Sequence, residues 1–276
     1  MNSICCKSYM SSRLRVLGSG NAFCPPGRLH SCMLLDDRIL IDAPPTILLQ
    51  LQKNGISSSQ ISDLLITHWH GDHVFGLPFL LLDRRFISDR KGDSKLRIHL
   101  HPNGIERMRE ICSLAFPNTL EQIIEERVEW IVEDTGHANG WDYERFPVKH
   151  TPETDPHGYL LRDSRGFVLL HTGDSGPCET INQRIPISNA VLLEMGVPNG
   201  DNFPYHHTPR DIIEVAEKQN EKQFLITHSF ASGKEEENGF DMPALPQNTI
   251  QVEDRELYNL ELSGITILQS PSERRY

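Results

Sequence analysis

Four potential metal ligands lie within six consecutive residues of this chain. They are the imidazoles of His68, His70 and His73 and the carboxylate of Asp72. Imidazole and carboxylate groups together bind zinc, iron or manganese, whereas calcium and magnesium prefer sites built from oxygen alone. A polar turn with incidental surface histidines would rarely concentrate these residue types so densely. The spacing therefore predicts a transition-metal site.

Two apolar segments flank the cluster and must hold it in place. Residues 64–66 form a short apolar run bounded by polar residues, which is typical of a buried strand. Residues 77–82 are apolar with Pro78 near the first turn, and this pattern predicts a helix. Gly71, inside the cluster, leaves the backbone room to curl. The cluster is thus expected on a loop between a strand and a helix, where layered α/β folds carry their sites.

Three further strand-like segments also end in residues that can bind a metal. Residues 146–149 run into His150, residues 167–170 into a segment that ends at Asp174, and residues 224–227 into His228. The ends of strands from one sheet meet at one edge, so these groups are expected to gather around the first cluster. His171 is expected to support the site from behind at most. The remaining histidines lack such contexts and are expected at the surface: His30, His99, His101, His137, His157 and His206.

Seven ligands exceed the needs of one zinc ion and fit two ions that share one carboxylate. We expect Asp174 to bridge, because a carboxylate offers two oxygens whereas an imidazole offers one free nitrogen. The other ligands divide into two sets, His68, His70 and His150 for one ion and Asp72, His73 and His228 for the second. The predicted cofactor is two zinc ions, with manganese or iron as alternatives. Asp72 is also a candidate catalytic residue.

The composition is that of a soluble globular protein, with 38% hydrophobic and 24% charged residues among 276. The net charge is −11, and no long run of lysine or arginine marks a nucleic-acid-binding tail. No apolar run is long enough to span a bilayer, and the first residues lack the apolar core of a signal peptide. We therefore expect a cytoplasmic protein without membrane association. Cys24 and Cys32 could pair or hold a metal, but all six cysteines are expected as reduced thiols.

A single domain is expected over residues 13–270, between a disordered segment at 1–12 and a frayed tail at 271–276. Gly18-Ser19-Gly20 is no dinucleotide-binding motif, because the third glycine and a following helical pattern are missing. The remaining patterns predict a hairpin over 32–42, a helix over 44–54 ended by Gly55, a strand over 96–100, a helix over 103–115, and strands over 128–132, 249–253, 257–262 and 265–268.

With these features the chain resembles the metallo-β-lactamase superfamily, and within it the ribonuclease Z branch. The resemblance runs from about residue 13 to 230. It implies an α/β fold of the αββα type, in which two mixed β-sheets pack face to face with helices outside, and a metal-dependent phosphodiesterase site at the sheet edge. The shared segments are His-Trp-His-Gly-Asp-His at 68–73 with Gly76-Leu77-Pro78, His150 with Gly158-Tyr159, Thr172-Gly173-Asp174, and Thr227-His228-Ser229.

Two further residues gain a role from the resemblance. Residues 191–196 look like the strand of that branch that carries an acidic residue, here Glu194, and His207 looks like its histidine just before a helix. Thr208 is a good N-cap and Pro209 suits the first helical position, so a helix is expected to begin there. Its N-terminus would attract a phosphate. His207 is assigned as the general acid toward the leaving oxygen, and Glu194 as the group that orients it or raises its pKa.

One departure bears on the substrate. Ribonuclease Z enzymes carry a long basic arm that grips the transfer RNA, whereas only 24 residues separate His150 from Asp174 here and they look like a plain hairpin. A small or cyclic phosphodiester is therefore the favoured substrate, and RNA remains open because a homodimer or a second subunit could supply a basic arm. The fold would also accommodate hydrolysis of a lactone, thioester or sulfate, or a di-iron sensor or non-catalytic subunit.

Overall fold

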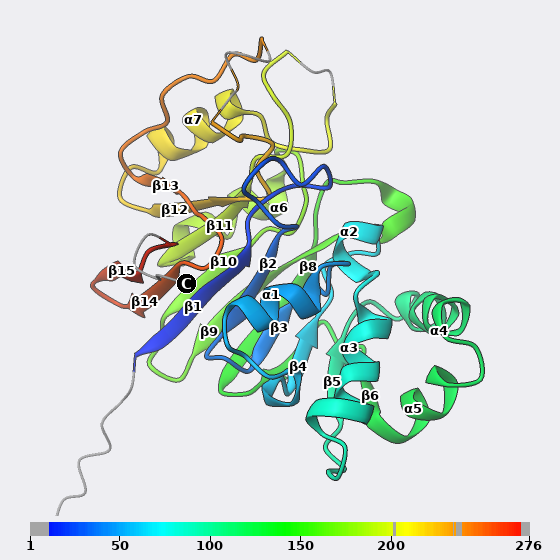
Figure 1. Ribbon diagram of the computed structural model, residues 1–276. Coiled ribbons are helices and arrows are strands. Elements are labelled where there is room, and N and C mark those ends of the chain that lie inside the picture. Colours follow the sequence, from blue (N-terminus) through cyan, green and yellow to red (C-terminus); the bar gives the residue numbers. More distant parts are fainter. Residues whose placement is uncertain (1–10, 201–202, 234, 236–238, 272–276) are drawn as a thin grey trace, which may run out of the picture.

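The computed structural model of the protein describes residues 11–200, 203–233, 235 and 239–271. Two β-sheets pack face to face, and helices cover the outer face of each (Figure 1). The predicted αββα sandwich is therefore confirmed. The larger sheet has the strand order β15 (Gly264–Gln269), β14 (Leu257–Glu261), β1 (Ser12–Gly18), β2 (Cys32–Leu35), β3 (Ile39–Ile41), β4 (Asp63–Leu65), β5 (Leu96–His99), β6 (Val128–Ile131). The smaller sheet has the order β13 (Thr249–Gln251), β12 (Gln223–Thr227), β11 (Ala190–Glu194), β10 (Val168–His171), β9 (His157–Asp163), β8 (Trp141–Pro147), β7 (Thr135–Ala138).

The helices divide between the two outer faces. The larger sheet is covered by α1 (Ile47–Lys53), α3 (Leu77–Asp83), α4 (Gly104–Ala115) and α5 (Leu120–Arg127). The smaller sheet is covered by α6 (Glu179–Asn182) and α7 (Pro209–Lys218). One turn of helix, α2 (Gly71–Val74), follows the metal motif. Short 3₁₀ turns lie at Ser58–Gln60, Pro152–Thr154 and Ile185–Ile187, and a π-helical turn at Arg84–Ser88 extends α3.

The alternation of side chains along each strand builds the layers. In β2, Met33 and Leu35 point into the space between the sheets, whereas Cys32 and Leu34 pack under the helices. Such strands are buried on both faces, which is why they read in the sequence as continuous apolar runs. The inner layer is filled by large rings that include Trp141 and Tyr159, both almost completely buried.

The topology brings several strand ends to one edge. β9 runs antiparallel to both β8 and β10, and β10, β11 and β12 are mutually parallel, so β8, β10, β11 and β12 all point the same way. Their carboxyl ends therefore meet at one edge of the smaller sheet. β4, which leads into the metal motif, belongs to the larger sheet. The expectation that all the ligand-bearing strands share one sheet is thus corrected, since the site lies where the ends of both sheets converge.

Most of the predicted elements are present, although the helices α2, α5 and α6 were not predicted. Two further differences concern strands. β1 begins at Ser12, inside the segment predicted to be disordered. Ser12 pairs in register with Leu260 of β14, and its Oγ donates a hydrogen bond to Asp163 Oδ2 at 2.8 Å. The rest of that segment, residues 1–10, and residues 272–276 of the predicted frayed tail lie outside the described residues. The second difference is the hairpin of β7 and β8 with its turn at Asn139 and Gly140, which the sequence patterns do not predict.

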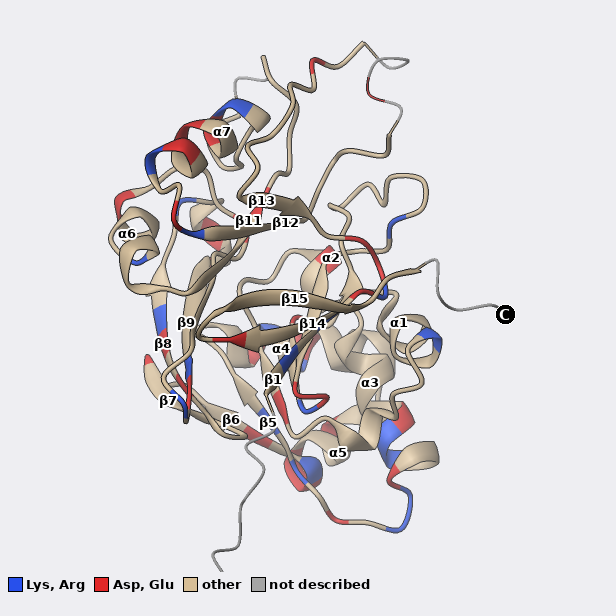
Figure 2. Ribbon diagram, turned by 90° about the vertical axis from the view of Figure 1, so that its left-hand side faces the viewer, with Lys and Arg blue, Asp and Glu red and all other residues tan. Residues whose placement is uncertain are grey.

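Charged positions of both signs are interspersed over the molecule. On α7, Arg210 and Lys218 flank the acidic residues Asp211, Glu214 and Glu217, so the helix carries both colours (Figure 2). This mixed pattern differs from the one-sided basic face that long nucleic acids require. Across the described ranges, no helix combines the length and the apolar character needed to cross a bilayer.

Candidate metal centre

The predicted metal motif occupies the loop after β4 and the single turn α2. His68 and His70 lie on the loop, and Asp72 and His73 on α2. Gly71 lets the Phe75 ring lie close to the start of α2, because a Cβ at Gly71 would lie 2.6 Å from that ring and the ring would have to move. The loop and the helical turn therefore present the four side chains to one side, as the sequence predicted.

Three histidines form the first cluster. Nδ1 of His70 lies 3.1 Å from Nε2 of His68 and 3.0 Å from Nε2 of His150, which follows β8. His68 Nδ1 donates to Thr67 Oγ1 at 3.0 Å, and His150 Nδ1 donates to the Tyr205 carbonyl at 3.0 Å. Because these Nδ1 atoms carry the protons, both Nε2 atoms keep their lone pairs and face the common centre.

Two carboxylates and two histidines form the second cluster. His73 Nε2 lies 3.3 Å from Oδ2 of both Asp72 and Asp174, and His228 Nε2 lies 3.5 Å from Asp72 and 3.1 Å from Asp174. Asp174 Oδ2 is also 3.9 Å from Nε2 of His68 in the first cluster. Asp174 thus stands between the clusters, where a bridging carboxylate would have to be.

The residues present fit a pair of metal ions. Nε2 of His73 and Nε2 of His228 are buried and have no hydrogen-bond partner, which is costly unless a further group occupies the centre. The charges point the same way. Burial alone would raise the pKa of Asp174, but His228 and His73 outweigh it and hold this pKa well below its usual range. Ionised carboxylates and imidazole lone pairs that converge at these distances are the donor set of zinc, manganese and iron sites.

Asp42, at the end of β3, supports the cluster from behind and was not among the predicted site residues. Its Oδ2 accepts hydrogen bonds of 2.8 Å from His73 Nδ1 and from Thr67 Oγ1, and its Oδ1 accepts one of 2.8 Å from the Thr67 backbone. Asp42 therefore fixes the ring of His73 and the start of the metal loop together. The signal was present in the sequence, because residues 39–41 form a buried strand that ends in an acidic residue, as the strands before the other ligands do.

The histidine beside the metal cluster is His206 and not His207. His206 Nδ1 donates to Glu194 Oε1 at 2.8 Å, and its ring stacks on His228 with centroids 5.6 Å apart and planes 9° apart. Burial lowers the pKa of His206, but the Glu194 carboxylate outweighs burial and raises it to about 9. The expectation of a surface position for His206 is therefore wrong, and Glu194, which is 1% exposed, orients this ring.

His207 points away from the centre, so its assignment as general acid is corrected. Its Nδ1 donates to the Ser175 carbonyl at 2.5 Å, and its ring lines a separate cavity with Ile181, Leu193 and Val215. Burial lowers the pKa of His207, which disfavours the charged form that an acid needs. The predicted N-cap nevertheless forms, since Thr208 and Asp211 make a reciprocal capping box. Two adjacent histidines point to opposite sides, and the sequence alone could not tell which one faces the site.

Other predicted residues are placed as follows. His171 is buried behind Asp174, accepts a hydrogen bond from the Gly173 N–H at 3.1 Å, and has its pKa lowered to about 4 by burial. His99, expected at the surface, is buried against Asp63 and the Tyr143 hydroxyl, at 2.8 and 3.0 Å. Cys24 and Cys32 are free thiols, as expected.

A cavity of about 680 Å³ opens onto the two clusters. It is lined by His206 and by four of the proposed ligands, His70, Asp72, Asp174 and His228, and much of the remaining wall comes from the loops after β1 and β11. The wall residues are Asn21, Ala22, Phe23, Gly196, Val197 and Phe203.

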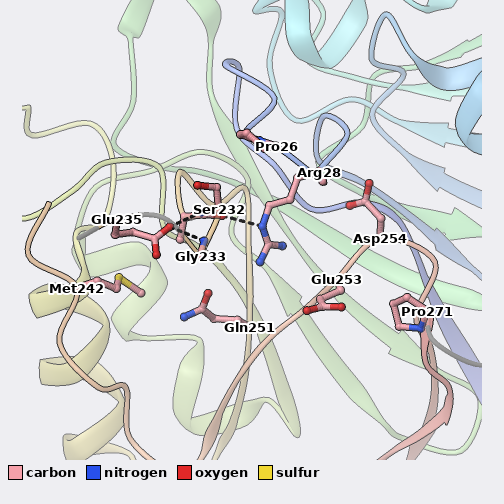
Figure 3. Close-up of a pocket in the computed structure, with 12 residues that line it drawn as sticks. Pro26, Arg28, Ser232, Gly233, Glu235, Met242, Gln251, Glu253, Asp254 and Pro271 are labelled. Carbon is pink, nitrogen blue, oxygen red and sulfur yellow. Dashed lines mark hydrogen bonds between the residues drawn. The ribbon is translucent and has the colours of Figure 1, made fainter. Parts of the chain in front are cut away.

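A bracket of partly buried polar groups around Arg28 ties the loop after β1 to the loops after β12 and β13, beside a second cavity of about 550 Å³ (Figure 3). Arg28 donates from Nε to the Ala231 carbonyl at 2.8 Å and from Nη1 to the Val252 carbonyl at 2.7 Å. The same Nη1 donates to Ser19 Oγ at 2.6 Å, and Asp254 Oδ1 accepts from the Ser19 backbone at 2.8 Å. The loops after β1, β12 and β13 are thus tied to one another next to the metal centre.

Comparison with known proteins gives a consistent result. The family model for the anti-Pycsar protein Apyc1 matches residues 12–228. Ribonuclease Z from Pyrobaculum aerophilum is 27% identical over 256 aligned residues, which cover 78% of this chain and 86% of that protein. Zinc phosphodiesterase ELAC protein 1 from Bos taurus is 28% identical over 219 residues, which cover 70% and 60%. The crystal structure of the metallo-β-lactamase fold protein YhfI from Bacillus subtilis matches with a TM-score of 0.67 at 17% identity, and covers 90% of this chain and 98% of that one.

Proposed function

The chain belongs to the family of the anti-Pycsar protein Apyc1, within the metallo-β-lactamase superfamily, and resembles ribonuclease Z; from this premise we propose that it is a metal-dependent phosphodiesterase of small or cyclic phosphodiesters. One observation carries the proposal. Seven potential metal ligands lie in two adjoining clusters, and four of them line one cavity together with a histidine that a buried carboxylate holds in place. A non-catalytic di-iron sensor would need the metal ligands but would not need a further histidine held in a fixed orientation beside them.

The two clusters define the residues that would hold two zinc ions. His68, His70 and His150 would bind one ion, Asp72, His73 and His228 the other, and Asp174 both. Manganese or iron are the alternatives that the same donor set accepts. Metal ions bound there would supply Lewis acidity toward the phosphoryl oxygens and would lower the pKa of water.

The chain's own groups would handle the proton of the leaving oxygen. With Nδ1 of His206 bonded to Glu194, the second ring nitrogen, Nε2, is left to hold a proton for the departing alkoxide. Glu194 also accepts hydrogen bonds from the backbone N–H groups of Ser175 and Gly196, at 3.1 and 2.5 Å, so its position is fixed by the loops after β10 and β11. We therefore assign His206 as the general acid and Glu194 as the residue that positions it.

The substrate proposal rests on the segment between His150 and Asp174. β9 and β10 form a plain antiparallel hairpin there, in register from Tyr159 and His171 to Arg162 and Val168. The chain thus presents no basic arm at this point, and its net charge is −11. A folded RNA needs many cationic contacts along its backbone, whereas a single phosphodiester needs only the metal centre. RNA cleavage is the second candidate, because ribonuclease Z is among the relatives.

The test is to measure kcat/KM of the metal-loaded protein for a precursor transfer RNA, a cyclic nucleotide, a lactone and a thioester, each at low and moderate salt. Asp174→Asn serves as the matched inactive variant that exposes contaminating activity. We expect turnover of the cyclic phosphate with little dependence on salt. Efficient cleavage of the transfer RNA with a steep salt dependence would favour RNA instead, and preferred turnover of the lactone or thioester would replace the phosphodiesterase assignment.

The wider organisation follows the same proposal. We place one catalytic domain from residue 12, where β1 begins, to residue 270, acting in the cytoplasm. A homodimer, or a second subunit with a basic arm, would be needed if RNA proved to be the substrate. Sedimentation of the active protein, with and without the RNA, distinguishes these arrangements.

A further inference from the structure

Two aromatic side chains stand exposed at the mouth of the active-site cavity. Phe23 is 87% exposed and Phe203 is 47% exposed, and both line the cavity whose base carries the proposed metal ligands. They come from separate loops, after β1 and after β11. Exposed large apolar groups that gather at one concave site, rather than being scattered, mark a surface that binds something apolar.

Phe23 sits on a turn that is anchored to the catalytic loops. Asn21 is buried, and its Oδ1 accepts a hydrogen bond from the Phe23 N–H at 3.1 Å. Asn21 also donates from Nδ2 to the Gly196 carbonyl at 3.0 Å and from its backbone to the Ser229 carbonyl at 3.2 Å. The ring is therefore presented to solvent from a fixed backbone. An aromatic ring has only two side-chain torsions, so a ring on a fixed backbone binds a partner ring with little loss of conformational entropy.

Phe203 is the outer member of a series of stacked rings that begins at the metal centre. Its ring stacks on His206, with centroids 5.6 Å apart and planes 19° apart, and His206 stacks in turn on His228. Three nearly parallel rings thus lead from a proposed metal ligand to the rim. A planar group attached to a phosphate at the metal centre would lie beside this series of ring faces.

The other lining residues leave few further means of holding the organic part of a substrate. Within the described residues, no lysine or arginine lines the cavity, and the remaining wall is made of Ala22, Gly196 and Val197. Both side-chain polar atoms of Asn21 are already used inside the protein. Contact with aromatic faces is therefore the main interaction that the wall can offer.

We propose that Phe23 and Phe203 form an aromatic rim that binds the organic group of the substrate through its ring face. The rim selects phosphodiesters that carry a planar aromatic group, such as a nucleobase, over those that carry only a sugar or an alkyl group. This selectivity rests on the proposed phosphodiesterase function and adds to it the two residues that set substrate preference. Phe23 makes the direct contact, and Phe203 also keeps the His206 ring aligned.

The experiment compares two substrates with the same reacting group. One is a nucleoside 3′,5′-cyclic phosphate, and the other is the cyclic phosphate of methyl riboside, in which a methoxy group replaces the base. Metal-loaded wild type, Phe23→Ala, Phe23→Leu and Phe23→Trp are assayed on both. Phe86→Ala is the matched control, because Phe86 is 49% exposed but lies outside the cavity.

Stacking of a base on an aromatic side chain corresponds to roughly 5- to 150-fold in binding. We expect Phe23→Ala to lower kcat/KM for the nucleotide by about that factor, mainly through KM, and to leave the methyl riboside within about twofold. Phe23→Leu should lose most of the preference although it keeps apolar bulk, whereas Phe23→Trp should retain it. Phe86→Ala should match the wild type.

Equal losses on both substrates, or full activity of Phe23→Leu, would show that Phe23 does not recognise a ring face and would overturn the rim. Failure of the proposed function gives a different result. Wild-type protein would then hydrolyse neither cyclic phosphate nor bis(p-nitrophenyl) phosphate, and the rim would lose its substrate as well. Thermal unfolding of each variant confirms that the comparison is made on folded protein.

Discussion

The carboxylate of Asp42 holds the imidazole of His73 from the side opposite to the proposed metal. Asp42 Oδ2 lies 2.8 Å from Nδ1 of His73, while Nε2 of the same ring lies 3.3 Å from Asp72 and Asp174. The arrangement fixes the tautomer, since Nδ1 carries the proton and Nε2 keeps the lone pair.

Replacing Asp42 by Asn should weaken metal binding without breaking the loop. Asn tolerates the left-handed backbone that Asp42 adopts, with φ of 63°, and keeps one acceptor for Thr67. Loss of the carboxylate should lower metal affinity by about 10- to 100-fold, measured by competition with a chromophoric chelator. Asp37→Asn is the matched control, because Asp37 has φ of 54° but forms a partly buried ion pair with Arg15 outside the metal clusters. Equal affinity in both variants would contradict the role of Asp42.

Replacing Asp174 by Asn should reduce the metal content and nearly abolish activity, because Asp174 is the carboxylate that reaches both clusters. Elemental analysis should give about two ions per chain for the wild type and one or fewer for the variant. Asp155→Asn, which removes a nearby carboxylate with φ of 41° outside the clusters, should leave the content unchanged. One ion per chain in all three proteins would rule out the two-metal scheme.

Substitution of the adjacent histidines should separate catalysis from folding. His206→Ala should lower kcat by roughly 10²–10⁴-fold for a substrate with an alkoxide leaving group, and far less for p-nitrophenolate, which leaves without a proton. His207→Ala should instead lower the free energy of unfolding by about 1–3 kcal/mol, because the Ser175 carbonyl loses its partner, and should not change the ratio between the substrates. If His207→Ala alone changed that ratio, the acid would be His207 after all.

The pH dependence of stability should include a contribution from His157. Burial lowers the pKa of this ring to about 4 from an unfolded value near 6.5, so the unfolded chain takes up a proton first as the pH falls. The stabilisation is complete above pH 6.5 and declines between pH 6.5 and 4. Between pH 7 and pH 4.5, the free energy of unfolding should therefore fall by about 2 kcal/mol less in His157→Gln than in the wild type, as measured by urea unfolding. Parallel pH profiles would show that His157 titrates normally in the folded state.

The proposed metal ligands could be named from the sequence because their signal is local. Buried strands that end in His68, His150 or His228 are recognisable one at a time, and the sandwich topology then brings them together. The choice between His206 and His207 depended on something else, namely the direction in which the chain enters α7. Glu194 selects His206 through a hydrogen bond across the sheet edge, and such a contact leaves no mark in either local segment.

The missed elements have different causes. Asp42 carries the same signal as the ligands, but its strand also fits one half of a hairpin, which accounts for the acidic residue equally well. The turn between β7 and β8 is an Asn139-Gly140 pair with positive φ at both residues, which is a favoured two-residue hairpin turn. β7 is only partly buried because it lies at the edge of its sheet, so the alternation of buried and exposed residues is weak in that strand.

The bracket around Arg28 also sets an order of events during synthesis. Ser19 stands 235 positions before Asp254, and β1 pairs with β14 through partners as distant as Ser12 and Leu260. The ribosome therefore releases the proposed ligands from His68 to Asp174 long before it releases Asp254 and β14, which secure the loop after β1. Until then β1 has an unpaired edge, and contacts of such long range form slowly. A nascent chain therefore carries most of the ligands before it can form the contacts that hold the loop beside the metal centre.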